Sequence, residues 1–176
     1  AARMERAGLS CSVSCVEFDG TRLAEQDELP ESLSGSFESV LVDAPCSGVG
    51  TMRRHPEIAW ALDESALSGG PETLASLQLS LLRAASARVA PGGFLVYATC
   101  SVLSCENEDV VDAFLASEEG SGFELAGVLG APGVASLPDE GRALVSPWVD
   151  ERGMFQSVPA ADGPDGHFCA RLVRVS

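Results

Sequence analysis

"VLVDAPCSGVGTMRRHPEIAW", residues Val40–Trp60, is the stretch that decides the fold. It begins as a continuous apolar run of the kind that forms a buried strand in a parallel sheet, and turn-forming residues end it. Asp43, Pro45 and Cys46 then follow in close succession. We therefore predict a strand over residues 39–48 that delivers an acid and a thiol to its carboxyl end.

A second apolar strand, "FLVYATCS" at residues 94–101, also ends in a thiol, Cys100. In open α/β sheets the reactive crevice lies at the carboxyl ends of the strands. If the two strands are parallel, Cys46 and Cys100 share one pocket. The alternating stretch "CSVSCVEFD", residues 11–19, predicts another strand, which brings Asp19 to the same edge.

Helical patterns separate these strands. Leucines recur at helical spacing over residues 73–89, which predicts a long amphipathic helix that "APGG" ends. A second helix is expected over residues 105–117, with Ser104 as its N-cap and acids in its first turn. Strands that alternate with helices predict an α/β fold with a mainly parallel sheet. The other expected elements are a helix over 1–9, a weak strand over 123–128, a Gly- and Pro-rich surface stretch over 130–141 and an alternating final strand over 166–175.

The composition limits the classes of function. The chain has 176 residues and a net charge of −15, and it has no lysine, so all eleven basic residues are arginine. This acidity argues against a broad electrostatic grip on nucleic acid, but it leaves room for a local one at Arg53 and Arg54. No apolar run is long enough to cross a bilayer, so we expect no membrane association.

The six cysteines form no C-x-x-C pair. Their spacing predicts neither a metal site nor a dense disulfide scaffold, and the default setting is a reducing cytoplasm. Cys46 stands apart because the preceding proline restricts the turn that aims its side chain. A nearby helix start would favour its thiolate. The other four are expected to be small buried apolar residues, namely Cys11, Cys15, Cys105 and Cys169.

A glycine-rich cofactor turn is the missing element. An α/β enzyme that binds a nucleotide-like cofactor usually opens with a strand and such a turn. Here the chain begins inside a helical pattern, and no such turn precedes Cys11. We therefore expect a chain whose first part is missing.

Two motifs carry a resemblance to a known family. Asp43-Ala44-Pro45-Cys46-Ser47-Gly48 and Thr99-Cys100-Ser101 resemble the signatures of the NOL/NOP/Sun family of RNA cytosine-5 methyltransferases, above all its bacterial 16S ribosomal RNA members. The resemblance implies a Rossmann-like class I methyltransferase sheet, mostly parallel with an antiparallel final strand, whose amino-terminal strands are absent here. Residues 1–176 would then be a single partial S-adenosylmethionine-dependent catalytic domain.

The resemblance also implies roles for individual residues. Cys100 would add to carbon 6 of cytosine, and Cys46 would assist release of the methylated product. Asp43 would hydrogen-bond the cytosine and border the cofactor, S-adenosylmethionine. Asp19 would contact the adenosine end of the cofactor, beside Pro45. On the residues alone, Asp19 reads instead as a side chain that caps the turn at the end of its strand.

RNA is the partner that the resemblance implies, and ribosomal RNA is favoured. Arg53, Arg54 and His55 are expected to contact its phosphates, although a short basic run is ordinarily a set of solvated loop charges. Trp60 would either stack on a base or pack on a helix. The absent strands would leave the edge of the strand over 39–44 open, so self-association through that edge is also expected.

Two other readings remain open at this point. DNA cytosine methylation also uses a Pro-Cys thiol, as the nucleophile, but "YATCS" has no place in that enzyme. A non-catalytic remnant that serves as an interaction module is the alternative from another class, and the fragment alone would then be inert. The motifs leave open which cytosine and which RNA is modified, the oligomeric state, and cofactor binding by the isolated chain.

Overall fold

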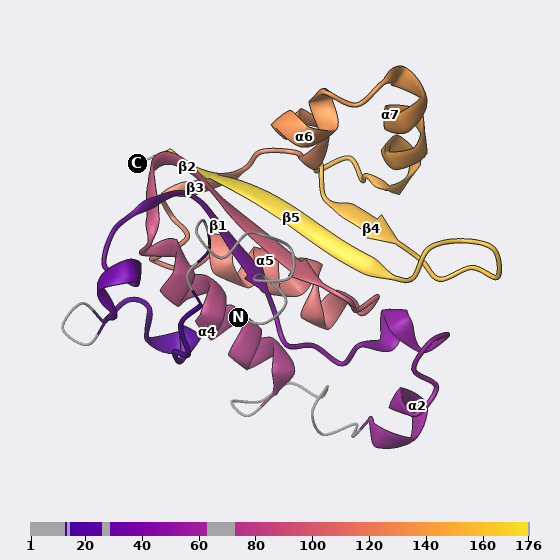
Figure 1. The fold of residues 1–176 in the computed structure, drawn as a ribbon, viewed down its shortest axis with the longest axis horizontal. Coiled ribbons are helices and arrows are strands. Elements are labelled where there is room, and N and C mark those ends of the chain that lie inside the picture. Colours follow the sequence, from indigo (N-terminus) through magenta and orange to yellow (C-terminus); the bar gives the residue numbers. More distant parts are fainter. Residues whose placement is uncertain (1–12, 14, 26–28, 63–72, 176) are drawn as a thin grey trace.

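A five-stranded sheet forms the centre of the computed structural model (Figure 1). The structure describes residue 13 and residues 15–25, 29–62 and 73–175, so the expected helix over 1–9 and Cys11 lie outside the described residues. The strand order is β1-β2-β5-β3, and β4 pairs with β5. The strands are β1 (Phe37–Asp43), β2 (Val89–Thr99), β3 (Phe123–Leu125), β4 (Phe155–Ser157) and β5 (His167–Arg174).

The sheet is mixed. β1 and β2 are parallel, whereas β2, β3 and β4 each pair with β5 in the antiparallel sense. The expected α/β class and the antiparallel final strand are confirmed. Because β1 and β2 are parallel, the carboxyl ends of both strands lie at the same edge of the sheet.

Two helices, α4 (Leu74–Ser86) and α5 (Glu108–Leu115), pack against the sheet through one core. Alternate residues of β2 are buried beneath them, among them Leu95 and Tyr97, which are fully buried. The shorter helices are α2 (Ile58–Ala61), α6 (Pro132–Ala135) and α7 (Asp139–Val145), and the last two stand beyond the end of the sheet near β4 (Figure 1). Single 3-10 turns are η1 (Gly20–Arg22), η2 (Glu31–Leu33), η3 (Val49–Thr51), η4 (Ser104–Glu106), η5 (Val128–Gly130) and η6 (Ser146–Trp148).

The predicted helix over 73–89 is confirmed, but it ends at Ser86 and the next strand begins earlier than expected. The Phe37 N–H donates to the Arg88 carbonyl, at 2.7 Å, so the ladder with β1 starts before "APGG". A register shift between Phe37 and Ser39 absorbs the glycines, of which Gly92 has a φ of 74°. "APGG" is therefore a bulged part of β2, and not a loop.

The predicted strand over 11–19 is wrong for the part that the structure describes. Residues 15–19 belong to no strand. An alternating pattern becomes a strand only where a neighbour completes its hydrogen-bond ladder, and no described strand runs beside these residues. Cys15 is exposed, contrary to the expected burial, whereas Cys105 and Cys169 are half-buried.

The predicted helix over 105–117 begins later than expected. Its first turn is the separate 3-10 turn η4, and α5 starts at Glu108 with Asn107, not Ser104, at the N-cap. Asn107 is buried, and its Oδ1 accepts a hydrogen bond, at 2.6 Å, from the hydroxyl of Thr99 at the end of β2. The stretch over 130–141 lies at the surface, as expected, and contains α6 and the start of α7.

β1 lies at an edge of the described sheet. Within the described ranges it pairs only with β2, and Leu41 is 65% exposed. Self-association through this edge remains a prediction. Among the described helices, none is long and apolar enough to span a bilayer.

Candidate active site at the strand tips

The two thiols that the sequence singled out lie in contact. Asp43, at the end of β1, pairs in register with Ala98 of β2, so the next residues of both strands leave the sheet side by side. The Sγ atoms of Cys46 and Cys100 are 3.2 Å apart, and both side chains are half-buried. The two strand ends thus bring the two thiols together, as the sequence predicted.

The turn after Cys46 is tied to the backbone of Cys100. The Gly50 N–H donates to the Cys100 carbonyl at 3.0 Å, and the Gly50 carbonyl accepts from the Gly166 N–H at 2.8 Å. A Cβ on Gly50 would lie 2.2 Å from the Gly166 oxygen, so only glycine allows this approach. Gly48 adopts the left-handed conformation, with a φ of 71°, and turns the chain into η3.

A buried acid, Glu106 of η4, connects the turn that follows Cys46 with the turn that follows Cys100. It accepts hydrogen bonds from the serine that follows each cysteine, Ser47 and Ser101, and from Gln78 of α4. Sequence reasoning missed Glu106 because it placed the residue in the exposed first turn of a helix. The repeated Cys-Ser pair was the signal that could have pointed to a shared partner.

The environment of Cys46 keeps its thiol protonated. Burial, and then the hydrogen bond with Cys100, raise the pKa of the Cys46 thiol to about 11. The expectation of a favoured thiolate is therefore wrong for this residue, because burial and the neighbouring thiol outweigh the backbone hydrogen bonds that lower its pKa. The Cys46 thiol is therefore protonated at neutral pH.

The three predicted cofactor residues line one cavity of about 500 Å³. Asp43 and Pro45 lie at its β1 side, and Asp19 at its η1 side. Its carboxylates suit ribose hydroxyls, and its apolar walls suit an adenine ring, so these residues fit a nucleoside-like cofactor. The other lining residues are Phe18, Gly20, Thr21, Leu23, Leu41, Val42, Leu77, Leu81 and Ala85.

Asp19 also has a local structural role. Its Oδ1 accepts from the Thr21 N–H at 3.0 Å and from the Thr21 hydroxyl at 2.7 Å, and it caps η1. These hydrogen bonds lower the pKa of the Asp19 carboxyl. The turn-capping interpretation from the sequence is thus observed, in a residue that faces the cofactor-sized cavity.

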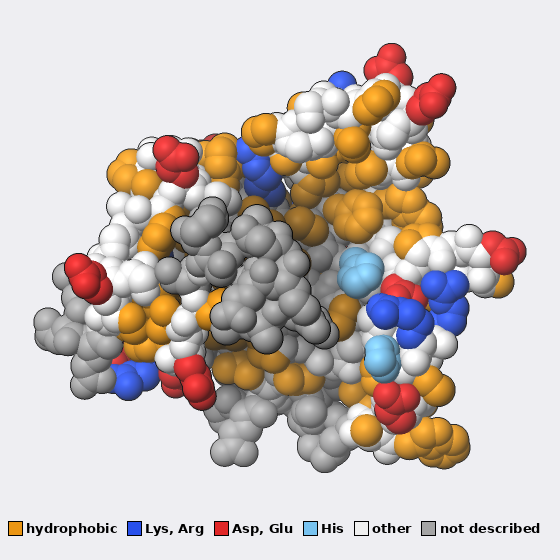
Figure 2. Space-filling model, viewed as in Figure 1, with side chains coloured by type: hydrophobic (Ala, Val, Ile, Leu, Met, Phe, Trp, Pro, Cys, Tyr) orange, Lys and Arg blue, Asp and Glu red, His pale blue; other side chains and the backbone are white. Residues whose placement is uncertain are grey.

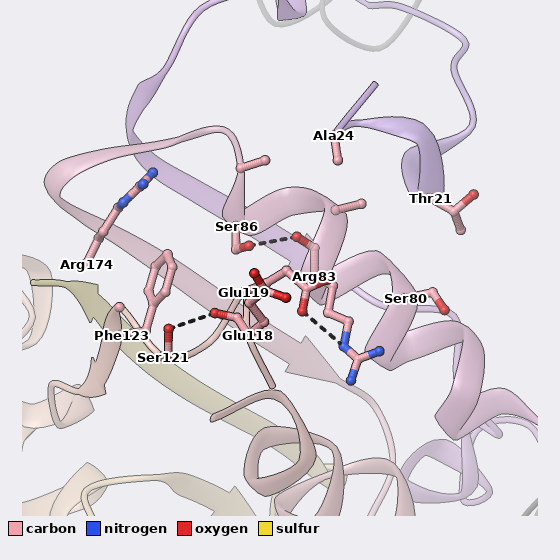
Figure 3. A pocket seen from close by; sticks show the side chains of 13 residues that line it. Thr21, Ala24, Ser80, Arg83, Ser86, Glu118, Glu119, Ser121, Phe123 and Arg174 are labelled. Atoms are coloured by element: carbon pink, nitrogen blue, oxygen red, sulfur yellow. Dashed lines mark hydrogen bonds and ion pairs between the residues drawn. The ribbon is translucent and has the colours of Figure 1, made fainter. Parts of the chain in front are cut away.

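A second cavity, of about 540 Å³, lies away from the thiols between the end of α4 and the segment that leads into β3 (Figure 3). Arg83 and Glu119 face each other across it, with 3.7 Å between Nε and Oε2. Its charges therefore compensate one another within the chain. None of the predicted site residues lines it.

The predicted RNA-binding residues lie together beyond η3. Asp165, nearly buried, pairs with Arg53 at 3.3 Å and with Arg54 at 2.5 Å, and these arginines lower the pKa of its carboxyl. The Nδ1 atom of His55 lies 3.2 Å from Oε1 of Glu57. Figure 2 shows the resulting cluster of basic, histidine and acidic side chains at one side of the molecule.

Trp60, in the short helix α2, is 91% exposed. The helix-packing interpretation of this tryptophan is therefore wrong, and its ring is open to a partner. Within the described part of the chain, no group of three or more His, Cys, Asp or Glu side chains is placed to hold a metal ion.

Comparison with known proteins gives a consistent result. A family model described as 16S rRNA methyltransferase RsmB/F matches residues 1–173. The chain is 38% identical over 143 residues to ribosomal RNA small subunit methyltransferase B of Pseudomonas syringae pv. tomato. That match covers 80% of this chain and 28% of the relative, so the chain spans little more than a quarter of that protein.

Solved structures share the fold. The crystal structure of PH0851 matches with a TM-score of 0.70 and 28% identity, over 96% of this chain and 32% of that one. NSun6 from Pyrococcus horikoshii, solved with SFG, matches with a TM-score of 0.66 and 23% identity, over 99% of this chain and 38% of that one. These likenesses confirm the Rossmann-like class I methyltransferase fold.

Proposed function

The chain belongs to the RsmB/F family of 16S rRNA methyltransferases, and from that premise we propose that residues 1–176 form part of the catalytic domain of an RNA cytosine-5 methyltransferase. This membership confirms the resemblance to the NOL/NOP/Sun family that the Pro-Cys and Thr-Cys motifs indicated. The single observation that carries the proposal is the contact of Cys46 and Cys100, 3.2 Å apart at the ends of two parallel strands.

Cys100 is the nucleophile in this proposal. Its thiolate adds to carbon 6 of the cytosine, and the new S–C bond makes carbon 5 electron-rich. S-adenosylmethionine supplies the methyl group that carbon 5 takes. Loss of the carbon-5 proton then restores the double bond between carbons 5 and 6 and expels the thiolate of Cys100.

Cys46 assists the release step. Its thiol is protonated at neutral pH and lies against the sulfur that must leave, so it can stabilise the departing thiolate by a hydrogen bond. A residue with this environment is a poor nucleophile at neutral pH. The raised pKa of the Cys46 thiol therefore supports the assignment of addition to its neighbour, Cys100.

Asp43, Asp19 and Pro45 serve the cofactor and the base. Asp43 is exposed at the end of β1 and borders the cavity that Asp19 and Pro45 also line. We assign to Asp43 the hydrogen bond to the cytosine ring and to Asp19 the adenosine end of S-adenosylmethionine. The presence of SFG, an analogue of that cofactor, in the NSun6 structure supports this use of the fold.

RNA, with ribosomal RNA as the favoured substrate, is the proposed partner in the cytoplasm. Arg53, Arg54 and His55 would contact its phosphates, and the two guanidinium groups would exchange their ion pairs with Asp165 for phosphate. Pairing of a second chain along the open edge of β1 is a further proposal.

The experiment uses the protein that carries this chain, its substrate RNA and denaturing gels. Cys46→Ala should accumulate a covalent protein–RNA complex, because addition proceeds and release fails. Cys100→Ala should form none and should not methylate. Cys169→Ala is the matched control, since it removes another half-buried thiol, on β5, that the proposed reaction does not use. A complex trapped by Cys100→Ala alone would instead support the Pro-Cys nucleophile of DNA cytosine methylation.

A further inference from the structure

Glu106 is a fully buried acid, 1% exposed, for which the proposed reaction has no direct use. A buried acid is costly unless its oxygens are fully hydrogen-bonded. Oε1 accepts from the Ser47 N–H at 2.8 Å and from the Gln78 amide at 3.1 Å. Oε2 accepts from the hydroxyls of Ser47 and Ser101, each at 2.5 Å. Four donors on two oxygens is the pattern of an ionised carboxyl group, which only accepts.

The donors are the residues beside the two thiols. Ser47 directly follows Cys46, and Ser101 directly follows Cys100. Both serine hydroxyls meet the same oxygen of Glu106, and they lie 3.4 Å from each other. One carboxylate oxygen therefore holds the Pro-Cys turn and the Thr-Cys turn together.

Glu106 is itself fixed to the sheet and to α4. The buried Tyr97 hydroxyl of β2 donates to its backbone carbonyl at 2.6 Å. Gln78, which is also fully buried, donates from the same amide nitrogen to the Pro45 carbonyl at 3.0 Å and to Oε1. Hydrogen bonds from β2 and α4 thus fix Glu106, and its carboxylate oxygens face both turns.

We propose that Glu106 is the positioning residue that sets the distance between the two reactive thiols. It touches neither substrate nor the reacting atoms, and acts through Ser47 and Ser101. This inference rests on the proposed function for its importance, because a two-thiol reaction needs both sulfurs within reach of one cytosine. Charge-assisted hydrogen bonds are the strong and directional ones, which suits a carboxylate to this task.

The test measures the distance between the thiols without RNA or cofactor. In the protein that carries this chain, with every cysteine except Cys46 and Cys100 changed to alanine, dibromobimane links Cys46 to Cys100 by two alkylations that release two bromides. The ratio of the cross-linking rate to the rate of single alkylation by monobromobimane reports how close the sulfurs lie. Glu106→Ala should lower this ratio by about tenfold or more, because four buried donors lose their acceptor.

Glu106→Gln separates positioning from charge. Its amide oxygen can accept from the Ser47 N–H and Gln78, and its amide nitrogen can donate to the two serine hydroxyls, which rotate to accept. The ratio should therefore stay within about twofold of the parent. Glu124→Gln, on the exposed face of β3, is the matched control and should change nothing.

Serine variants keep the test decisive if Glu106→Ala does not fold. Ser47→Ala and Ser101→Ala each remove one hydroxyl donor to Glu106 at nearly unchanged volume, and each should lower the ratio while the protein stays folded by circular dichroism. Unchanged ratios in folded Glu106→Ala, or in both serine variants, would overturn the proposal. A Cys100→Ala protein that still methylates RNA would refute the proposed function, and would leave the cross-linking result standing.

Discussion

The neutral thiol of Cys46 can be tested by its rate of alkylation across pH. Its pKa of about 11, against an ordinary 9.0, lowers the thiolate fraction at pH 8 by about a hundredfold. A thiolate of higher pKa is intrinsically more nucleophilic, with a Brønsted slope of about 0.5, which returns about tenfold. Cys46 should therefore react with iodoacetamide about tenfold more slowly than an ordinary cysteine at pH 8, with a midpoint near pH 11.

The perturbation that tests the cause is Cys100→Ala. Burial is the larger cause of the raised pKa and stays in the variant, whereas the hydrogen bond between the thiols disappears. The midpoint should fall, yet remain above 9.0. Mass spectrometry can follow the reaction, since the tryptic peptide 23–53 contains Cys46 as its single cysteine. A midpoint near 9 in the parent, or one that Cys100→Ala leaves unmoved, would refute this account of the site.

Three other outcomes follow from the same structure. The free energy of unfolding, measured by urea titration, should decline as pH rises from about 9 to about 11, because the folded protein keeps the Cys46 proton to higher pH than the unfolded chain does. Cys46→Ala should make this dependence of the unfolding free energy on pH weaker. Gly50→Ala should destabilise the fold by about 1–3 kcal/mol, because its Cβ would collide with the Gly166 carbonyl, and a thermal melt within error of the parent would contradict the close approach. Asp165→Asn should steepen the salt dependence of RNA binding, because it frees Arg53 and Arg54 to bind phosphates. Arg142→Ala, on the distant α7 (Figure 1), should not steepen it. A shallower salt dependence for Asp165→Asn would mean that the two arginines need Asp165 to hold them in place for RNA binding.

The meeting of the two thiols was predictable from the sequence. Two apolar runs that each end in a cysteine imply parallel strands with adjacent carboxyl ends, and the register of Asp43 with Ala98 confirms that inference. The final strand was predictable for a similar reason, because the alternation over 166–175 fits an antiparallel partner with one buried face.

The support beneath the thiols was not predictable. The sequence places Glu106 in a run of acids that opens a helix, where an exposed side chain is the normal outcome. A break after η4, at Asn107, turns Glu106 inward instead. Likewise, the predicted strand failed over the described residues 15–19, because an alternating pattern says nothing about whether a neighbouring strand is present to complete its ladder.

The central claim is that Cys100 attacks the base and Cys46 releases it. The most direct measurement is mass spectrometry of the covalent complex formed by the Cys46→Ala protein with its RNA after digestion with trypsin and nuclease. We expect a cytosine nucleotide attached at Cys100, within the tryptic peptide 89–142, and not at Cys105 of the same peptide. A nucleotide found at Cys46 of the peptide 23–53, in the Cys100→Ala protein, would contradict it.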